Sequence, residues 1–347
     1  MRVSDFDYQL PKGRIAQYPA LERDRSRLMV LHRKGQRIEH RIFSEIQEYL
    51  KPGDLLVLND AKVLPARLYG WKEGSGGRVE ALLLREKGIR DWEVLLRPTK
   101  GLRPGKRLHF ANGALIAEVR DRCEEGHFLL SFRANGDFWE LLEKYGRMPL
   151  PPYIKRQGSG KVEALDRERY QTVYAREGGA IAAPTAGLHF TEELLRRVEA
   201  LRVKLHYLTL FVGPGTFRPV RAEEVEEHRM EAERYYISET TAKAINLAKV
   251  EGRRVIAVGT TTTRALEDSA LKKGRVKAGP GEADLFIYPG FRFQVVDALI
   301  TNFHLPRSSL LMLVSAFANL GFIKEAYQEA VSEGYRFYSY GDAMLIL

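Results

Sequence analysis

The chemistry that this chain can perform is suggested first by His189, which lies in the run Ala-Pro-Thr-Ala-Gly-Leu-His-Phe-Thr at residues 183–191. Small residues, glycine and proline allow a backbone to approach a bound molecule closely. Thr191 and the two acidic residues after it predict a helix that begins just beyond the histidine. Histidine titrates near pH 6.5, so His189 is a candidate general base or acid. A structural turn with a buried histidine is the competing interpretation.

Polar side chains also follow two apolar runs, at residues 55–58 and 294–300. Ligands of open α/β sheets bind beyond the carboxyl ends of the strands, so both places are candidate ligand sites. For the polar residues after the second run, the competing interpretation is a plain strand-to-helix turn with Ser308 as the helix cap. The polar residues are Asn59, Asp60, Thr301, Asn302 and His304.

Two loops have the composition of ligand-binding loops. Residues 258–264, Val-Gly-Thr-Thr-Thr-Thr-Arg, join an apolar run to a predicted helix, whose first N–H groups can bind an anion. This loop lacks both the three-glycine dinucleotide fingerprint and the Gly-Lys-Ser/Thr phosphate loop, so alone it is a weak signal. The second loop, Val-Gly-Pro-Gly-Thr-Phe at 212–217, is equally well explained as a flexible turn.

Nothing in the sequence indicates a metal site. No two of the eight histidines are spaced three or four residues apart. The single cysteine, Cys123, excludes a disulfide within the chain and a cysteine-based zinc or iron–sulfur site. We therefore expect no metal.

The charge of the chain favours a polyanionic partner. The 55 Lys and Arg outnumber the 45 Asp and Glu, which gives a net charge of +10. Three windows are basic and free of acids, at residues 97–107, 144–161 and 202–221, and tyrosine and phenylalanine interleave with the last two. Such surfaces suit phosphate contacts and base stacking, so RNA is the expected partner. A charge-rich thermostable protein without RNA is the alternative.

A cytoplasmic protein is expected, without membrane association. Asp5 and Asp7 stand where a signal peptide needs apolar residues. The longest apolar run, near residues 310–314, is far shorter than the roughly 20 residues that span a bilayer.

The hydrophobic pattern predicts an α/β main domain with an inserted small antiparallel β-barrel domain. Between residues 67 and 132 short apolar runs alternate with turn signals, which predicts five or six strands. Elsewhere strands alternate with helices, including strands at 284–288 and 294–300. The expected boundaries are residues 1–65 plus 150–347 for the discontinuous α/β domain and 66–149 for the barrel.

Together, the motifs resemble one family, the S-adenosylmethionine:tRNA ribosyltransferase-isomerases of queuosine biosynthesis. The resemblance covers essentially the whole chain. Its most specific stretches are residues 183–191, 301–306 with 311–317, and Tyr-Arg-Phe-Tyr-Ser-Tyr-Gly-Asp-Ala-Met at 335–344. Further matches lie at residues 5–8, 15–17, 24–28, 58–60, 65–68, 148–154 and 170–175.

The resemblance implies a reaction. The ribosyl part of S-adenosylmethionine (SAM) is transferred to the aminomethyl group of a 7-deazaguanine at the wobble position of a tRNA. Isomerisation gives the epoxycyclopentane of epoxyqueuosine, and adenine and methionine leave. SAM is a co-substrate, no cofactor is bound permanently, no metal is required, and the partner is the tRNA anticodon stem-loop. We expect a monomer.

The resemblance also suggests residue roles. The candidate catalytic residues are Asp60, His189 and His304. The candidate SAM-binding residues are Thr185, Gly187, Gly213, Gly215, Thr216, Thr260, Arg264 and Asn302. The candidate tRNA-binding residues are Asn59, Arg67, Arg103, Lys106, Arg107, Lys155 and Arg156.

The sequence departs from the family pattern at two positions where histidine is usual, Phe211 and Glu231. If either histidine were the obligate base, this chain would be weakened. Residues 59–62, Asn-Asp-Ala-Lys, also differ mildly from the usual Asn-Asp-Thr-Arg. Two other hypotheses remain. One is a non-catalytic RNA-binding protein of the same fold. The other is a SAM methyltransferase, against which the glycine pattern after Val258 argues.

Overall fold

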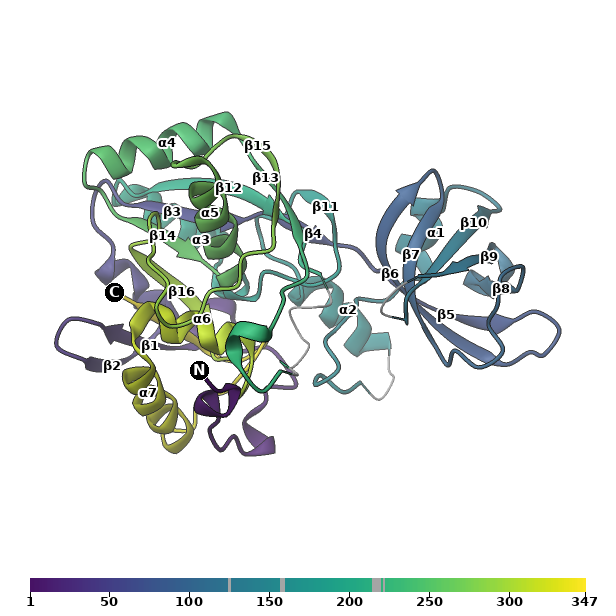
Figure 1. Cartoon of the computed structure of the whole chain (residues 1–347), viewed down its shortest axis with the longest axis horizontal. Coiled ribbons are helices and arrows are strands. Elements are labelled where there is room, and N and C mark those ends of the chain that lie inside the picture. The colour runs from purple at the N-terminus through teal and green to yellow at the C-terminus, as the bar shows by residue number, and fades with distance from the viewer. Residues whose placement is uncertain (124–125, 157–159, 214–219, 221) are drawn as a thin grey trace.

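The computed structural model describes residues 1–347 except 124–125, 157–159, 214–219 and 221. A mixed sheet flanked by helices forms one body and a closed barrel of six strands forms the other (Figure 1). Both chain termini lie in the larger body (Figure 1). The predicted fold class, α/β with a small antiparallel barrel, is confirmed.

The main sheet has nine strands, and its centre is parallel. The neighbouring strands β12, β3, β14 and β16 all run in one direction, whereas both edges contain antiparallel pairs. Parallel strands with both faces covered are apolar throughout, and β3, β14 and β16 are buried at every position. In order across the sheet the strands are β15 (Gly279–Ala283), β13 (Glu233–Ile237), β12 (Lys204–Leu210), β3 (Leu55–Asn59), β14 (Val255–Val258), β16 (Ala298–Asn302), β17 (Ala343–Ile346), β1 (Arg27–His32) and β2 (Arg37–Ile42).

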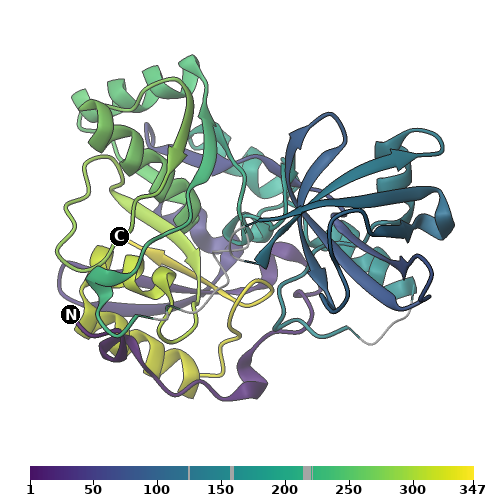
Figure 2. The ribbon, with the colours of Figure 1, turned by 45° about the vertical axis from the view of Figure 1, so that its right-hand side comes forward.

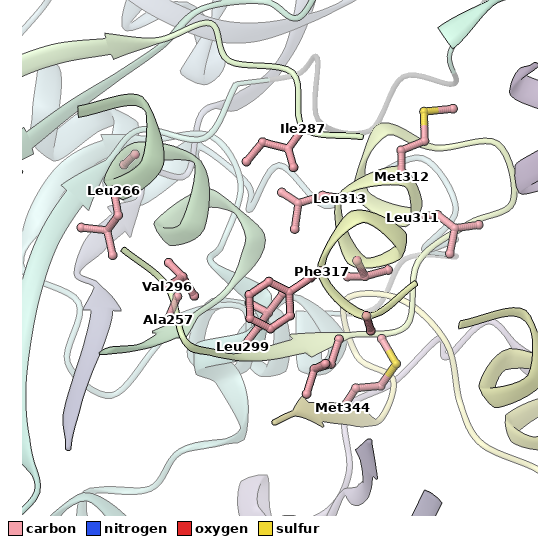
Figure 3. Close-up of a cluster of buried hydrophobic side chains, with 14 of the residues drawn as sticks. Ala257, Leu266, Ile287, Val296, Leu299, Leu311, Met312, Leu313, Phe317 and Met344 are labelled. Atoms are coloured by element: carbon pink, nitrogen blue, oxygen red, sulfur yellow. The ribbon is translucent and has the colours of Figure 1, made fainter. Parts of the chain in front are cut away.

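Helices cover both faces of this sheet. One face packs against α3 (Glu192–Ala200) and the 3₁₀ helix Phe43–Tyr49. The other packs against α4 (Glu239–Val250), α5 (Thr260–Lys273), α6 (Ser309–Ala318) and α7 (Leu320–Ser332). Figure 3 shows part of this second core, where α5 and α6 meet the buried strands β14, β16 and β17.

The helices begin where the sequence places an N-cap. The side chains of Thr191, Ser238 and Ser308 each accept a hydrogen bond from the backbone N–H three residues later. Each cap satisfies one of the donors that a helix start leaves open. These caps fix the starts of α3, α4 and α6 relative to the sheet.

The barrel is a separate closed sheet. Its strands alternate inward apolar and outward polar residues, and α1 (Phe138–Tyr145) packs Phe138 and Leu142 into its core. Figure 2 shows it beside the larger body. Figure 1 labels α2 (Gly160–Arg169) and the short pair β4 (Ala61–Val63) and β11 (Glu177–Ala180) near the junction. Its strands, in order, are β10 (Phe128–Ala134), β7 (Asp91–Arg97), β6 (Arg78–Gly88), β5 (Arg67–Lys72), β8 (Arg107–Phe110) and β9 (Leu115–Arg122).

Two strand predictions near the C-terminal part of the sheet are wrong. Residues 284–288 form no strand, because their apolar side chains pack against the core without pairing in the sheet. The strand expected at 294–300 begins only at Ala298. The edge strand is instead β15, Gly-Pro-Gly-Glu-Ala, whose glycines and proline have low strand propensity but are tolerated at an edge.

Candidate functional site

A cleft lies at the edge of the main sheet where β14 and β16 end. It holds about 810 Å³, including the part that opens to solvent. Segments far apart in the sequence line it: the 3₁₀ helix Thr185–His189, the start of α5, the residues after β16, and the loop before β17. The polar lining residues are Tyr153, Thr185, Thr260, Thr261, Thr301, Asn302, His304, Ser308, Tyr338 and Ser339.

The floor of the cleft contains the N-terminus of α5. Gly259 has a φ of +98°, a conformation that favours glycine, and its N–H donates to Ile300 O at 2.8 Å. The helix then begins with Thr260 and Thr261, both of which line the cleft. Unpaired N–H groups at a helix start are donors for a ligand. Of the predicted ligand loop at residues 258–264, Gly259, Thr260 and Thr261 line the cleft.

His189 lies behind the cleft and is fully engaged by its neighbours. Its Nε2 is 3.1 Å from Asn302 Nδ2, and its Nδ1 is 2.6 Å from Ser26 Oγ. Asn302 Nδ2 also donates to the carbonyl oxygen of Tyr338 at 3.1 Å, which identifies this atom as the amide nitrogen. Nε2 must therefore accept, Nδ1 carries the proton, and Ser26 Oγ accepts it.

Burial keeps this imidazole neutral. Loss of hydration, together with the positive charges of Arg336 and Arg23, lowers the pKa of His189 to about 3. Its ring stacks on Phe43, with centroids 4.9 Å apart. A neutral histidine with both nitrogens hydrogen-bonded inside the protein positions its neighbours better than it exchanges protons with a ligand.

The group that this network positions is the amide of Asn302. Asn302 is 2 % exposed and lines the cleft, yet its Oδ1 has no hydrogen-bond partner among the residues that the structure describes. A buried acceptor without a donor costs about 1–3 kcal/mol. His189 and Tyr338 both hold the NH₂ side of the amide, so the orientation of the side chain is set and Oδ1 is left without a donor among the described residues.

His304 is the histidine that lines the cleft itself. Its Nε2 is 2.9 Å from Thr301 Oγ1, and its backbone is held by the hydroxyls of Tyr8 and Tyr327. Nδ1 forms no hydrogen bond with any described residue. Burial lowers the pKa of His304 to about 3, so the imidazole is neutral at cellular pH. A rigidly held neutral imidazole with an unused nitrogen can exchange a proton with a ligand.

Two tyrosines form an aromatic wall of the cleft. The rings of Tyr153 and Tyr338 lie with centroids 4.1 Å apart, and the Tyr153 hydroxyl is 2.6 Å from Ser339 Oγ. Tyr338 has a φ of +76°, which is rare for a bulky residue and marks a strained backbone. This strained residue supplies the carbonyl that holds Asn302. The electron-rich faces of the two rings can attract a cation.

No Lys, Arg, Asp or Glu lines this cleft within the described part of the chain. Its polar groups are hydroxyls, one amide, one neutral imidazole and backbone N–H groups. Buried neutral dipoles need no counter-ion, whereas a buried unpaired charge is costly. The cleft is therefore suited to a ligand that is recognised through hydrogen bonds and aromatic contacts.

Asp60 lies at the same edge of the sheet but does not line the cleft. It follows β3, and its carboxylate accepts a hydrogen bond from Thr209 Oγ1 at 2.7 Å. Burial raises the pKa of Asp60, and the bond from Thr209 opposes that shift. Asp60 therefore lies just after β3, outside the cleft that His304 lines.

Several residues predicted to bind SAM have other surroundings. Arg264 is buried, pairs with Glu233 and donates to the carbonyls of Ala283 and Leu285, so its guanidinium stabilises the sheet edge. Gly187 is covered, because a Cβ there would lie 2.0 Å from the Tyr174 hydroxyl. Among the described members of that predicted set, only Thr185, Thr260 and Asn302 line the cleft. Gly215 and Thr216 lie outside the described residues.

Gly213 lines a second cavity, which lies between the barrel and the main sheet. This cavity also contains Phe211 and Glu231, the two positions where the family usually has histidine. Val212 borders both the cavity and the cleft. Phe211 and Glu231 therefore lie next to the cleft, and neither of them lines it.

The predicted RNA-binding residues are divided between exposed and engaged side chains. Asn59 is fully buried and its amide bonds to Leu210 and Ala61, so it cannot contact RNA in this conformation. Arg67 pairs with Glu80, and Arg156 makes a two-pronged ion pair with Asp166. The exposed or half-exposed members are Arg103, Lys106, Arg107 and Lys155.

Sequence reasoning gave no role to Ser26 or Tyr338, and it counted Tyr153 only among the aromatic residues of the basic window 144–161, as part of a surface for RNA. All three lie in segments that carry the family resemblance, at residues 24–28, 148–154 and 335–344. That resemblance was the only available signal, because the contact between Ser26 and His189 joins residues 163 positions apart. Only the folded sheet brings these residues together.

The described residues hold no group of three or more His, Cys, Asp or Glu placed to bind a metal ion. Within the same part of the chain, no single helix is long and apolar enough to cross a membrane. The helices α6 and α7 pass that test only as a pair, and the pair is bent by 114°.

The fold and the site define a class of protein: an α/β protein with an inserted barrel and a cleft at the carboxyl edge of its sheet. The family model described as queuosine biosynthesis protein matches residues 3–346. The chain belongs to this family.

Similar proteins agree with that assignment. Proteins named S-adenosylmethionine:tRNA ribosyltransferase-isomerase, from Halothermothrix orenii and Symbiobacterium thermophilum, are 54% and 53% identical to the chain over 347 residues, and each alignment covers 100% of both proteins. A crystal structure of the S-adenosylmethionine tRNA ribosyltransferase from Thermotoga maritima is similar with a TM-score of 0.57 and 42% identity, over 99% of this chain and 100% of that one. The chain is an enzyme of this family.

Proposed function

We propose that this enzyme transfers and isomerises the ribosyl group of SAM onto the aminomethyl group of 7-aminomethyl-7-deazaguanine at the wobble position of tRNA. The products are epoxyqueuosine-tRNA, adenine and methionine. The single observation that carries the proposal is the cleft, which has no charged side chain in its described lining and is lined by Asn302, whose buried Oδ1 has no donor among the described residues. The family names support SAM and tRNA as the substrates.

The cleft has groups for each part of SAM. Asn302 Oδ1 can accept a hydrogen bond from the adenine amino group or from a ribose hydroxyl. Thr260 and Thr261, at the start of α5, offer further donors to the ribose and to the carboxylate of the methionine part. The sulfonium fits the rings of Tyr153 and Tyr338, because an aromatic face attracts a cation without needing a buried carboxylate.

The reaction needs proton transfers inside the cleft. The positive sulfonium acidifies the adjacent ribose carbon and makes the methionine part a leaving group. A neutral His304 with a free Nδ1 can take that proton, and the imidazolium so formed can return a proton to the departing adenine. His189 acts through Asn302 and does not itself touch the substrate.

The RNA approaches from outside the cleft. Its reactive amine must reach the ribose carbon, so the tRNA anticodon loop has to lie across the open side of the site. One chain supplies every residue named above, and we propose that it acts as a monomer in the cytoplasm, where its tRNA substrate resides.

Adenine release tests the proposal. Purified protein is mixed with SAM and a tRNA that carries the aminomethyl-deazaguanine, and free adenine is followed by chromatography. Adenine is expected with the modified tRNA and not with an unmodified one. Release of S-adenosylhomocysteine in place of adenine would identify a methyltransferase. Binding of tRNA without any consumption of SAM would identify a non-catalytic RNA-binding protein.

A further inference from the structure

The outer surface of the barrel carries a row of aromatic side chains that crosses the adjacent strands β6, β5, β8 and β9. The strand pairing places Arg78 of β6 opposite Trp71 of β5, Trp71 opposite His109 of β8, and His109 opposite Ile116 of β9. Tyr69 lies two residues before Trp71, and therefore on the same face. We call Tyr69, Trp71, His109, Arg78 and Arg107 the stacking face.

The two large rings of this face are exposed, and the ring of Trp71 is stacked on that of His109. Tyr69 is 49 % exposed and Trp71 38 % exposed. The indole of Trp71 and the imidazole of His109 are stacked, with centroids 5.5 Å apart and planes inclined by 8°. Gly70 permits this close approach of β5 and β8, since a Cβ there would lie 2.0 Å from His109 O. Large exposed aromatic side chains on an outward strand face are unusual and indicate a binding surface.

Cations surround these rings. Arg147 lies 5.0 Å above the Tyr69 ring while it pairs with Glu163. Among the described residues, Arg78, Arg103 and Arg107 form no ion pair, although all three are exposed. The nearby carboxylates are already engaged: Glu80 with Arg67, Glu118 with Arg120, and Glu73 with His109 at 3.4 Å. The face therefore offers unneutralised positive charge.

We propose that the stacking face binds an unpaired loop of RNA, with bases stacked on Tyr69 and Trp71 and phosphates on Arg78 and Arg107. Flat rings with cations at their rim fit unstacked bases joined by phosphates, and a paired helix hides the base faces that such rings need. An apolar protein partner would leave the arginines unneutralised. The proposal rests on the proposed function, because it assigns this surface to the tRNA substrate beyond the reacting nucleotide.

Equilibrium binding of a hairpin RNA with an anticodon-type loop tests the proposal in the absence of SAM. Trp71→Ala is expected to weaken binding roughly tenfold, the loss of one stacked base. The matched control is Trp139→Ala, since Trp139 is a 47 % exposed tryptophan on α1 of the same barrel, packed on Trp92 and away from this row. The control is expected to bind as the unchanged chain does. Trp71→Phe keeps a ring and is expected to retain most of the affinity.

Salt dependence gives the second measurement. Each phosphate contact contributes about 0.7 to the slope of log affinity against log salt for single-stranded nucleic acid, so Arg78→Gln and Arg107→Gln are each expected to reduce the slope by about that amount. Unchanged affinity for Trp71→Ala with unchanged thermal unfolding would overturn the proposal, as would equal loss of binding to a blunt duplex of the same length. Failure of adenine release would overturn the proposed function and leave these binding results intact.

Discussion

The cleft and the stacking face are built in opposite ways. The cleft is buried, and its polar groups are neutral and fixed by one another, as in the chain from Ser26 through His189 to Asn302. The stacking face is exposed, its rings are open to solvent, and the charges of Arg78 and Arg107 have no carboxylate partner among the described residues.

This difference follows from what each environment allows. A charge buried without a partner is expensive, whereas fixed neutral dipoles in a site that excludes water can stabilise charge that develops during a reaction. An exposed cation costs little folding free energy and attracts a polyanion, although salt weakens that attraction. The comparison implies that turnover and RNA affinity can be changed separately by mutation.

The largest effect is expected at Asn302. Asn302→Ala removes the only amide acceptor in the described cleft lining and releases His189, so the rate of adenine release at saturating RNA is expected to fall about 10²–10³-fold, as when a preorganised polar contact is lost. RNA affinity is expected to stay within about twofold, because distant sites act independently.

Asn246→Ala is the matched control for that variant. Asn246 is an asparagine of α4 that bonds to the backbone of Val276 and does not line the cleft. Its loss should leave the rate unchanged. Equal rates for the Asn302 and Asn246 variants would show that Asn302 has no part in the reaction. The contrast drawn between the cleft and the stacking face would then no longer hold.

The two histidines are expected to differ. His304→Gln removes the nitrogen proposed to move protons and is expected to lower kcat about 10²-fold, the scale of a general acid–base contribution. His189→Gln can still accept from Asn302 and donate to Ser26, so a loss of about tenfold or less is expected, in KM for SAM more than in kcat. Single-turnover and steady-state rates for both variants test this order. A reversed order would make His189 the proton-transfer group.

The same burial predicts a pH dependence of stability. Each histidine has a pKa of about 3 when folded, against about 6.5 when unfolded, so only the unfolded chain takes up protons between these values. Stability is therefore fully present above pH 6.5 and is lost as the pH falls towards 3. The loss at pH 5 is on the order of 1–2 kcal/mol for each histidine.

Urea unfolding at pH 7 and pH 5 measures this loss. The drop in unfolding free energy between the two pH values should be smaller for His189→Gln and for His304→Gln than for the unchanged chain. His40→Gln serves as the control, because His40 is on β2, is partly exposed and bonds to Glu329 and Tyr335. A drop that is the same in all four proteins would contradict the buried, neutral state of the two cleft histidines.

Much of the fold could be predicted from local patterns. The helix caps at Thr191 and Ser308 and the alternation of apolar runs with turn signals in the barrel are local signals, and the structure contains both caps and a closed barrel of six strands. The edge strand β15 was missed because its glycines and proline give no strand signal, and it exists only because β13 offers a free edge. Local propensity cannot report a partner that lies more than forty residues away.

The site was predictable only in part, for the same reason. His304 and Asn302 were proposed because they follow an apolar run, and His189 because it precedes a helix. The structure places Asn302 and His304 in the lining of the cleft and His189 next to Asn302. The role of Arg264 was misread: its place at the start of α5 suggested an anion site, but Glu233 on β13, an unpredicted strand, neutralises it. Ser26 and Tyr338 reach the site through long-range contacts that no spacing in the sequence encodes.

The smallest effect is expected where the chain departs from its family. Phe211 and Glu231 line the cavity beside the cleft and contribute no group to the cleft itself. Phe211→His with Glu231→His, made together, should therefore change the rate of adenine release by less than about threefold, the scale of substitutions away from reacting groups. The measurement is single-turnover release at saturating SAM and RNA, with each single variant as a control. A rise of tenfold or more, roughly 1.4 kcal/mol in the barrier, would show that a histidine in this second cavity takes part in the reaction. The reactive site would then extend past Val212, which lines both the cleft and the second cavity, and would include that cavity.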